Sequence, residues 1–486
     1  MEIALEDKQL IAQAKDFANE VWEDVVNDID LLVQVESVED LAHAAEGMPF
    51  GPAPREALDR ALGIAERLGL ASTNCEGYIG FADLVGKSET YLATIAHADI
   101  VPLGAGWTVD PLRVTRKDGY LLGRGVIDDK GPLVLSLYAA HFFARYVRAT
   151  GEPLPYTLRC IVGSNEETGM RDIDYYLNNY PGPAFCFTPD ASFPLICGEK
   201  GRFAAEVVSP KLKGDSSRIV LLEGGTVTNA VPGSARAVVR VAAEDLVGAE
   251  HIAIEPCGVG DDGKALCQIA ATGVGGHAAM PQNTLNAIGL LTDYLLEHEL
   301  CNEAERDFLQ FEHALLADWS GDALGIAAED DLFDPLTCVG GTVRTQVDGE
   351  HRQFVQTMDV RYPKSTTGEE IRAHVARIAG DHGCTLGASD DMAPFYVAPD
   401  SMEVEALVRT YNEIEGRNGK AFTIGGGTYA RHFTRAVAFG PADEEAKNPS
   451  WVGMEHGADE GVSEELLKNA LVIYIVSIAR LMRLSY

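Results

Sequence analysis

Histidine and carboxylate side chains occur in this sequence in combinations that suit catalysis on bound metal ions. They stand at His97, Asp99, Asp128, Asp129, Glu166, Glu167 and Asp190, and a further histidine, His456, lies far downstream. Mixed imidazole and carboxylate ligands suit zinc, manganese or cobalt better than calcium. One histidine, two terminal carboxylates and a shared carboxylate can hold two such ions about 3.5–4 Å apart. A second histidine completes the set, so these residue types predict a two-metal site.

Each of these groups alone also has an ordinary structural interpretation. A His-x-Asp at a strand end is usually a surface pair, and paired glutamates in an acidic chain usually form a solvated loop. The segment 123–131 (GRGVIDDKG) is more specific, because its glycines, arginine, aspartates and lysine predict a tight turn into a helix. The order His-x-Asp, this segment, Glu-Glu and Pro-Asp is hard to obtain by chance.

The polar groups follow strands of an expected α/β domain. Apolar runs predict buried strands at 90–101, 156–167 and 184–190, and each run ends in the residues named above. Amphipathic helices are expected between them and at residues 5–34, which favours a mostly parallel sheet. Ligands of such sheets bind beyond the carboxyl ends of the strands. The elements therefore predict that these side chains meet at one edge of the sheet.

The pattern changes in the middle of the chain. Strands of antiparallel type are expected at 234–243, 265–276 and 351–363, with amphipathic helices at 286–297 and 368–378. The helix–strand alternation returns after about residue 402. We therefore expect a discontinuous catalytic domain, 1–198 and 398–486, with an inserted α+β lid domain of two ferredoxin-like halves at 199–397.

The composition excludes several classes of function. The chain has 486 residues, and its 39 Lys and Arg against 74 Asp and Glu give a net charge of −35. Such a balance does not suit binding to nucleic acid or to an anionic membrane. The longest apolar stretches, 132–143 and 470–479, are too short to span a bilayer. The acidic N-terminus and nine scattered cysteines without a CxxC pair predict a cytoplasmic protein.

The sequence resembles the di-metal amidohydrolases of peptidase family M20, and within it the bacterial PepV-like dipeptidases. The resemblance covers nearly the whole chain. It rests on GRGVIDDKGP (123–132), SNEETG (164–169), FTPDASFP (187–194), TNAVP (228–232), GGHAAMPQ (275–282), DVRYP (359–363) and GGGTYAR (425–431).

This resemblance implies how the metal ligands are shared. His97 and Asp190 would bind one metal ion, Glu167 and His456 would bind the other, and Asp128 would bind both. Two divalent ions per subunit are expected, with zinc as the default and manganese or cobalt as alternatives.

The resemblance also implies the catalytic roles. Glu166 would be the general base that takes a proton from a metal-bridged water, and it would then pass the proton to the leaving amine. Asp99 would orient His97. In the inserted domain, His277 would donate a hydrogen bond to the tetrahedral oxyanion. Alone, a histidine after two glycines is more often a loop residue.

The remaining residues implied by the resemblance would contact the substrate. Arg361 could form a bidentate pair with a free carboxylate, although a strand-edge ion pair is its ordinary role. A free amino group could face Asp129, with weaker support. The expected substrate-binding residues are Asn229, Arg361, Gly426, Gly427 and Thr428.

We therefore predict a metallo-dipeptidase that hydrolyses short unblocked peptides. The alternatives are an N-acyl amino acid amidase, of the succinyl-diaminopimelate desuccinylase or aminoacylase type, and an inactive family member that binds metal or peptide. Closure of the domains would bring His277 and Arg361 to the metal ions. Because the long inserted domain would supply that histidine within the same chain, we expect a monomer whose partner is a small peptide.

Overall fold

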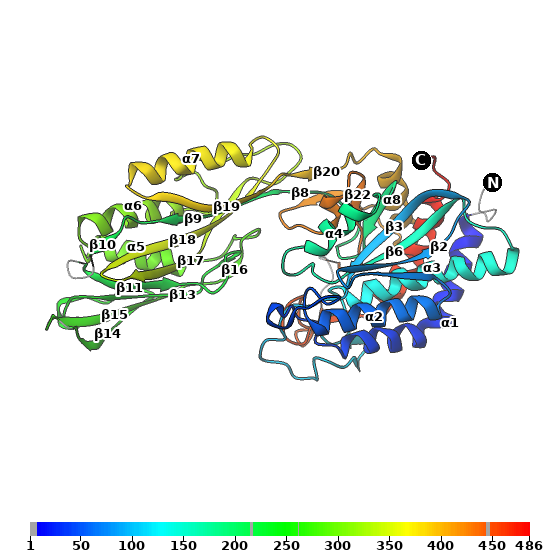
Figure 1. Ribbon diagram of the computed structural model, residues 1–486, viewed down its shortest axis with the longest axis horizontal. Coiled ribbons are helices and arrows are strands. Elements are labelled where there is room, and N and C mark those ends of the chain that lie inside the picture. The colour runs from blue at the N-terminus through cyan, green and yellow to red at the C-terminus, as the bar shows by residue number, and fades with distance from the viewer. Residues whose placement is uncertain (1–6, 214–216, 261, 444–447) are drawn as a thin grey trace. The chain divides into compact units, whose positions relative to one another are not determined.

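A computed structural model describes residues 7–213, 217–260, 262–443 and 448–486. The chain divides into two compact units (Figure 1). The first unit holds the residues up to Gly198 together with Tyr396–Phe422 and Gly427–Tyr486, and the second unit holds Glu199–Phe395 and Thr423–Gly426. Each unit has its own cluster of buried apolar side chains.

The first unit is built on a mixed sheet. Its central strands β6, β3, β7 and β22 run parallel, and antiparallel strands flank them. His97, the last residue of β3, lies opposite Gly163, the last residue of β6. The carboxyl ends of these strands therefore lie together, as the sequence predicts. In sheet order the strands are β1 (Ala71–Cys75), β2 (Ile79–Leu84), β6 (Tyr156–Gly163), β3 (Ser88–His97), β7 (Phe185–Thr188), β22 (Ala436–Ala438), β8 (Ile196–Glu199) and β20 (Phe395–Tyr396), and β21 (Phe422–Ile424) also pairs with β8.

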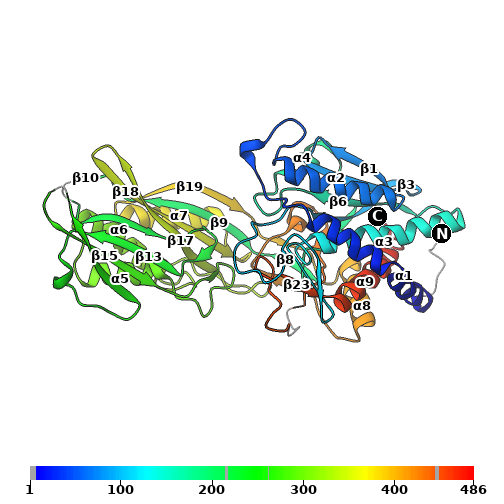
Figure 2. The same ribbon diagram turned by 90° about the horizontal axis from the view of Figure 1, so that it is seen from below.

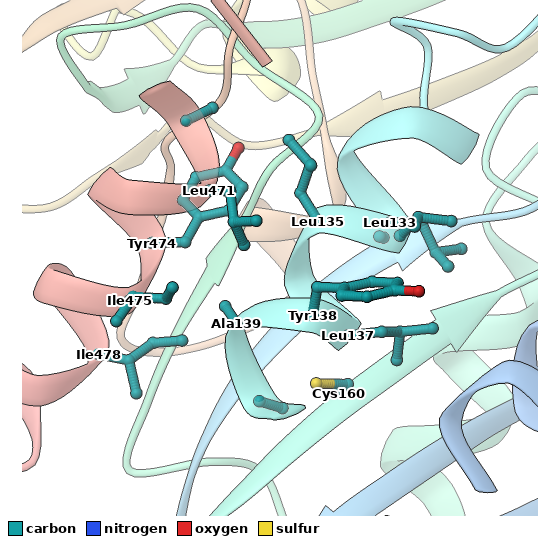
Figure 3. Close-up of a cluster of buried hydrophobic side chains, with 14 of the residues drawn as sticks. Leu133, Leu135, Leu137, Tyr138, Ala139, Cys160, Leu471, Tyr474, Ile475 and Ile478 are labelled. Carbon is teal, nitrogen blue, oxygen red and sulfur yellow. The ribbon is translucent and has the colours of Figure 1, made fainter. Parts of the chain in front are cut away.

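Helices α1, α3 and α9 pack against one another beside this sheet (Figure 2). Figure 3 shows α9 side chains, among them Leu471 and Ile475, turned toward Leu135 and Ala139 of α3. Such contacts stabilise the first unit, because truncating one buried leucine to alanine typically costs about 2–5 kcal/mol. The helices of this unit are α1 (Asp7–Val33), α2 (Pro52–Arg67), α3 (Lys130–Thr150), α4 (Arg171–Asn179), α8 (Met402–Glu415) and α9 (Glu464–Leu481), with 3-10 turns η1 (Leu41–His43) and η3 (Tyr429–His432).

A small antiparallel sheet in the first unit joins distant parts of the chain. Strand β5 (Tyr120–Leu122) pairs with β4 (Thr115–Lys117) on one side and with β23 (Gly461–Ser463) on the other. Strands β4 and β5 form a hairpin that turns at Asp118 and Gly119. The sheet therefore brings residues before Asp128 close to those after His456.

The second unit is an antiparallel sheet packed against three helices, α5 (Ala287–Glu297), α6 (Glu303–Leu316) and α7 (Gly368–Asp381). The sheet order is β14 (Ile252–Val259), β15 (Ala265–Thr272), β13 (Ser234–Val239), β11 (Ile219–Gly224), β17 (Thr337–Asp348), β18 (His351–Tyr362), β9 (Gly201–Val208) and β19 (Thr385–Met392), with β10 (Leu212–Lys213) beside β18. Strands β12 (Ala230–Val231) and β16 (Gly276–His277) form a separate pair, and η2 (Ala243–Asp245) is a short 3-10 turn.

The two units confirm the predicted fold class, a sheet-based α/β domain with an inserted α+β domain. The expected helix at 5–34 is α1, and residues 5 and 6 lie outside the described residues. Helix α6 lies within 299–336, a long connection with two acidic clusters for which the sequence predicts no element. Among the described helices, none combines the length and apolar character needed to cross a bilayer.

Candidate active site

The structure brings the predicted metal ligands together at the carboxyl edge of the first unit's sheet. Asp128 lies between the two histidines. His97 Nε2 is 3.1 Å from Asp128 Oδ1, and His456 Nε2 is 2.8 Å from Asp128 Oδ2. His97 Nε2 is also 3.7 Å from Asp190 Oδ2, and His456 Nε2 is 3.3 Å from Glu167 Oε2. Each oxygen of one carboxylate thus faces a different histidine, and each histidine faces a second carboxylate.

Chain segments far apart in the sequence supply these side chains. His97 ends strand β3, and Asp190 follows β7. Asp128 lies in the turn that leads into α3, where the Asp128–Asp129 peptide bond is cis. His456 comes from the loop before β23. Donor atoms of His97, Asp128 and Glu167 lie within 4.8 Å of one another, as do those of His97, Glu166 and Asp190.

The His97 ring is held in one orientation by the main chain. Its Nδ1 atom lies 3.0 Å from the carbonyl oxygen of Asp99, which can only accept, so Nδ1 carries a proton. Nε2 then faces the oxygens of Asp128 and Asp190. It is buried and has no hydrogen-bond partner among the described residues. The lone pair of Nε2 would repel carboxylate oxygens at 3.1 and 3.7 Å, so a proton or a metal ion must lie between them.

The crowded, buried carboxylates of the cluster favour the binding of positive charge. Burial raises the pKa of Glu166 and Glu167, and neighbouring carboxylates raise it further. Burial and the charge of Asp128 raise the pKa of Asp190 to about 8. Hydrogen bonds that the His456 ring donates to the carboxylates of Asp128 and Glu167 raise the pKa of His456 to about 11. Carboxylates crowded in this way retain protons unless a cation takes their place.

These observations fit a bound divalent metal. The donors are the imidazole nitrogens and carboxylate oxygens that zinc, manganese and cobalt accept. Glu167 Oε1, like His97 Nε2, is buried without a hydrogen-bond partner among the described residues. The residues present therefore suit the metal ions expected from the sequence.

The Asp99 carboxylate has a role that the sequence analysis missed. It was expected to orient His97, but Asp99 Oδ1 is 3.5 Å from His97 Nδ1 and the main-chain carbonyl makes the closer contact. The carboxylate instead accepts the backbone N–H groups of Glu166 at 3.2 Å and Glu167 at 3.1 Å. Asp99 thus fixes the turn that carries both glutamates.

A second support of the same turn comes from Asp172. Its Oδ2 atom accepts the N–H groups of Ser164 and Asn165 at 2.7 and 3.1 Å, and the hydroxyl of Tyr429 at 2.5 Å. Burial raises the pKa of Asp172 to about 6. No motif of the sequence indicated this residue, because an aspartate in the first turn of a helix is common.

Asp129, a weaker candidate for binding a substrate amino group, is fully buried. Its Oδ2 atom accepts the backbone N–H of His97 at 3.0 Å. This contact supports the metal-binding strand and does not favour a substrate contact.

In the second unit, the structure brings Asn229 and His277 together. The carbonyl of Asn229 accepts the N–H of Ala278, and β12 pairs with β16 so that Ala230 lies opposite His277. His277 is exposed, and its Nδ1 accepts the N–H of Ala279 at 3.2 Å. In the neutral ring the proton is therefore on Nε2, which is the donor expected at this position.

Arg361 is buried in the same unit and is held by an acid of its own strand. Its Nε donates to Asp359 Oδ1 at 2.6 Å, and its Nη1 donates to the carbonyl of Gly425 at 3.1 Å. Asp359 is 0% exposed and also accepts from Arg202 at 3.0 Å. These contacts fix the plane of the guanidinium while leaving further N–H groups for a ligand.

The glycine-rich segment 425–428 is shared by the two units. Gly425 and Gly426 belong to the second unit, and a side chain at Gly425 would meet Ala279 at 3.0 Å. Gly427 and Thr428 belong to the first unit. The Thr428 side chain caps the turn η3 by accepting the N–H of Ala430 at 3.1 Å.

Comparison with known proteins agrees with this arrangement. Residues 93–480 match the model of Peptidase family M20/M25/M40. The chain is 30% identical to the Beta-Ala-Xaa dipeptidase of Lactobacillus delbrueckii subsp. lactis over 486 residues, which cover 96% of this chain and 98% of that protein.

Two solved structures share the fold. Human carnosine dipeptidase 1 superposes with a TM-score of 0.57 at 14% identity, covering 98% of this chain and 99% of that one. The di-peptidase Dug1p of Saccharomyces cerevisiae superposes with a TM-score of 0.58 at 12% identity, with the same coverage. The resemblance found in the sequence is confirmed: the chain belongs to Peptidase family M20/M25/M40 and is a hydrolase of peptide bonds.

Proposed function

We propose that this protein is a two-metal dipeptidase that cleaves the amide bond of short peptides with free termini. The observation that carries the proposal is the position of Asp128, whose two oxygens face His97 on one side and His456 on the other. A single carboxylate in this position is suited to two cations at once. The similarity to the Lactobacillus dipeptidase over nearly the whole chain supports the substrate class.

The metal ligands are divided between the two ions. His97 and Asp190 would hold one ion, Glu167 and His456 would hold the other, and Asp128 would hold both. When bound, divalent ions polarise a carbonyl and lower the pKa of water. Zinc is the first choice for this ligand set, and manganese and cobalt are the alternatives.

Glu166 is the proposed general base. It is half-buried beside the ligands, and the N–H group at its own backbone is fixed by Asp99. Burial and the negative charge of the neighbouring Asp190 raise the pKa of the Glu166 carboxyl, which strengthens it as a proton acceptor. Glu166 takes a proton from the water that attacks the carbonyl carbon. The amide C–N bond then breaks, and Glu166 gives the proton to the leaving amine.

The second unit supplies most of the proposed substrate contacts, and Gly427 and Thr428 of the first unit supply the others. His277 Nε2–H donates to the oxyanion that forms when water adds to the carbonyl. Arg361, oriented by Asp359, pairs with the free α-carboxylate. Asn229 and the Gly426, Gly427 and Thr428 segment complete the polar contacts. The proposed grip of Arg361 on a free α-carboxylate favours a short substrate with a free carboxyl end, and we propose a dipeptide.

The same chain carries the metal ligands and the proposed substrate contacts, so we propose that a monomer is active. All nine cysteines are free, which suits a reducing, cytoplasmic setting. Size-exclusion chromatography with light scattering checks whether the active protein is a monomer. A stable dimer whose dissociation removed activity would contradict it.

The function is tested with a substrate panel after chelation and after adding back zinc, manganese or cobalt. The panel contains dipeptides, tripeptides, and N-acetyl and N-succinyl amino acids. Metal-restored cleavage of dipeptides, with blocked substrates left intact, is the expected result. Cleavage of the N-acyl substrates alone would move the function to an amidase. Dipeptide cleavage that survives complete metal removal would overturn the metal-dependent proposal.

A further inference from the structure

A buried ion pair joins the two chain segments that carry Asp128 and His456. Arg124 and Glu460 are 1% and 0% exposed, and Arg124 Nη1 donates to Glu460 Oε2 at 2.5 Å. The partners are separated by 336 positions in the sequence. Neither belongs to the metal cluster, and the proposed reaction gives neither a role. Several of their remaining contacts nevertheless go to the segments that carry Asp128 and His456.

The second oxygen of Glu460 holds the turn that presents Asp128. Glu460 Oε1 accepts the backbone N–H of Gly125 at 2.9 Å, and it lies 3.3 and 3.4 Å from the N–H nitrogens of Ile127 and Asp128. The carbonyl of Glu460 also accepts the N–H of Gly123 at 2.9 Å. One side chain thus sets the path of the backbone up to the carboxylate that faces both histidines.

Arg124 holds the segment that presents His456. Its Nη2 atom donates to the carbonyl of His456 at 3.1 Å and to that of Leu103 at 3.3 Å. His456 has φ +63°, a left-handed conformation that residues other than glycine rarely adopt. The ring of Trp107 covers the guanidinium, 5.2 Å from Arg124 Cζ. The hydrogen bond from Arg124 therefore stabilises a backbone conformation that His456 would otherwise tend to leave.

We infer that Arg124 and Glu460 are positioning residues for the metal ion assigned to Glu167 and His456. The inference rests on the proposed two-metal function. A buried ion pair contributes little net stability, because desolvation offsets the attraction of its charges. What this pair does contribute is a set of hydrogen bonds that keeps the Asp128 and His456 segments at a fixed separation. The ion at His97 and Asp190 depends less on it, because that site shares only Asp128 with this arrangement, and among the described residues neither Arg124 nor Glu460 bonds to His97 or Asp190.

The test uses the double variant Arg124→Met/Glu460→Gln. It removes the donor to the His456 carbonyl, leaves no buried charge unpaired, and retains an amide oxygen for the N–H groups near Asp128. The matched control is Asp83→Asn/Arg159→Met, which removes an ion pair between β2 and β6 in the same unit. That pair is bidentate, with distances of 2.8 and 2.7 Å, and touches no metal ligand.

Cobalt(II) binding to the metal-free full-length proteins is measured by calorimetry and visible absorption, and urea unfolding of the metal-free proteins is followed in parallel. We expect two sites in the wild type. In the Arg124→Met/Glu460→Gln variant one of the two sites, the one we assign to Glu167 and His456, loses about 10–100-fold in affinity. A loss of this size is usual when the support of a metal ligand is removed. The other site changes less than about threefold, and the control keeps both affinities.

Three results would overturn the inference. Unchanged affinity at both sites would show that the pair does not position His456. Equal losses at both sites, together with a lowered urea midpoint of the metal-free protein, would make the pair a general structural support. Equal weakening in the control would show that the loss of any ion pair in this unit has this effect. A wild type that binds fewer than two ions would instead refute the proposed function, which keeps the two failures distinct.

Discussion

Glu312 is a buried acid in the second unit whose ionisation should make the stability of that unit depend on pH. It lies on α6, is 0% exposed, and receives one hydrogen bond, from Thr292 Oγ1 to Oε2 at 2.8 Å. Its Oε1 atom has no hydrogen-bond partner among the described residues. Burial raises the pKa of Glu312 from 4.5 to about 8. The folded unit therefore keeps a proton on this carboxyl that the unfolded chain releases.

The sign and size of the effect follow from linkage. Between pH 4.5 and 8 the folded state binds more protons than the unfolded state, so the free energy of unfolding falls as the pH rises. The loss is about 1.4 kcal/mol for each pH unit, or about 3 kcal/mol between pH 4.5 and 7. Glu312→Gln keeps an acceptor for Thr292 and cannot ionise. We expect the variant to match the wild type near pH 5 and to be more stable by about 3 kcal/mol at pH 7.

The assay is hydrogen exchange of α6 peptides in increasing urea at pH 5, 7 and 8, which reports the unfolding of this unit separately. The control is Glu350→Gln, an exposed glutamate in the turn between β17 and β18. The difference between variant and wild type, taken as a function of pH, isolates residue 312 from the other titrating groups. A difference that is the same at every pH, or that matches the control, would refute the linkage argument.

The remaining predictions concern catalysis. Glu166→Gln should lower kcat by about 10²–10⁴-fold while two cobalt ions still bind, and normal turnover would exclude it as the general base. His277→Ala should lower kcat by about 10²–10³-fold with little change in KM, because its donor acts on the oxyanion; a change confined to KM would point to ground-state binding. Asp359→Asn should raise KM for dipeptides about tenfold, since it weakens the charge-assisted hydrogen bonds that orient Arg361; an amidated dipeptide should not show this rise.

Much of the metal cluster could be predicted from the sequence, because metal chemistry restricts the residue types. His97 and Asp190 each follow an apolar run of a length typical of a buried strand, and parallel strands end at the same edge of a sheet. His456 was harder to place, because it follows no strand and lies in a loop. The resemblance to a family supplied its expected position, and the structure places its ring beside Asp128.

Some elements left out of the sequence prediction did carry a local signal. Helix α6 begins at a capping box, in which the side chain of Asn302 accepts the N–H of Glu305 and the Glu305 side chain accepts the N–H of Asn302. Asn followed three residues later by Glu, before apolar residues at helical spacing, is a recognised start signal. The acidic composition of 299–336 obscured it. One acid there, Asp330, accepts the N–H groups of Leu332 and Phe333 and so has a structural role.

The supports of the ligands could not be predicted for a different reason. Asp99 holds the backbone N–H groups of Glu166 and Glu167, and Arg124 holds the carbonyl of His456. Backbone donors and acceptors occur at almost every residue, so the type of residue that receives such a bond carries no signal. A ligand can be recognised by its chemistry, whereas a support is recognised by what it touches. Charged residues that are buried near a site, and whose partners are backbone groups of ligand segments, therefore have to be found in the structure.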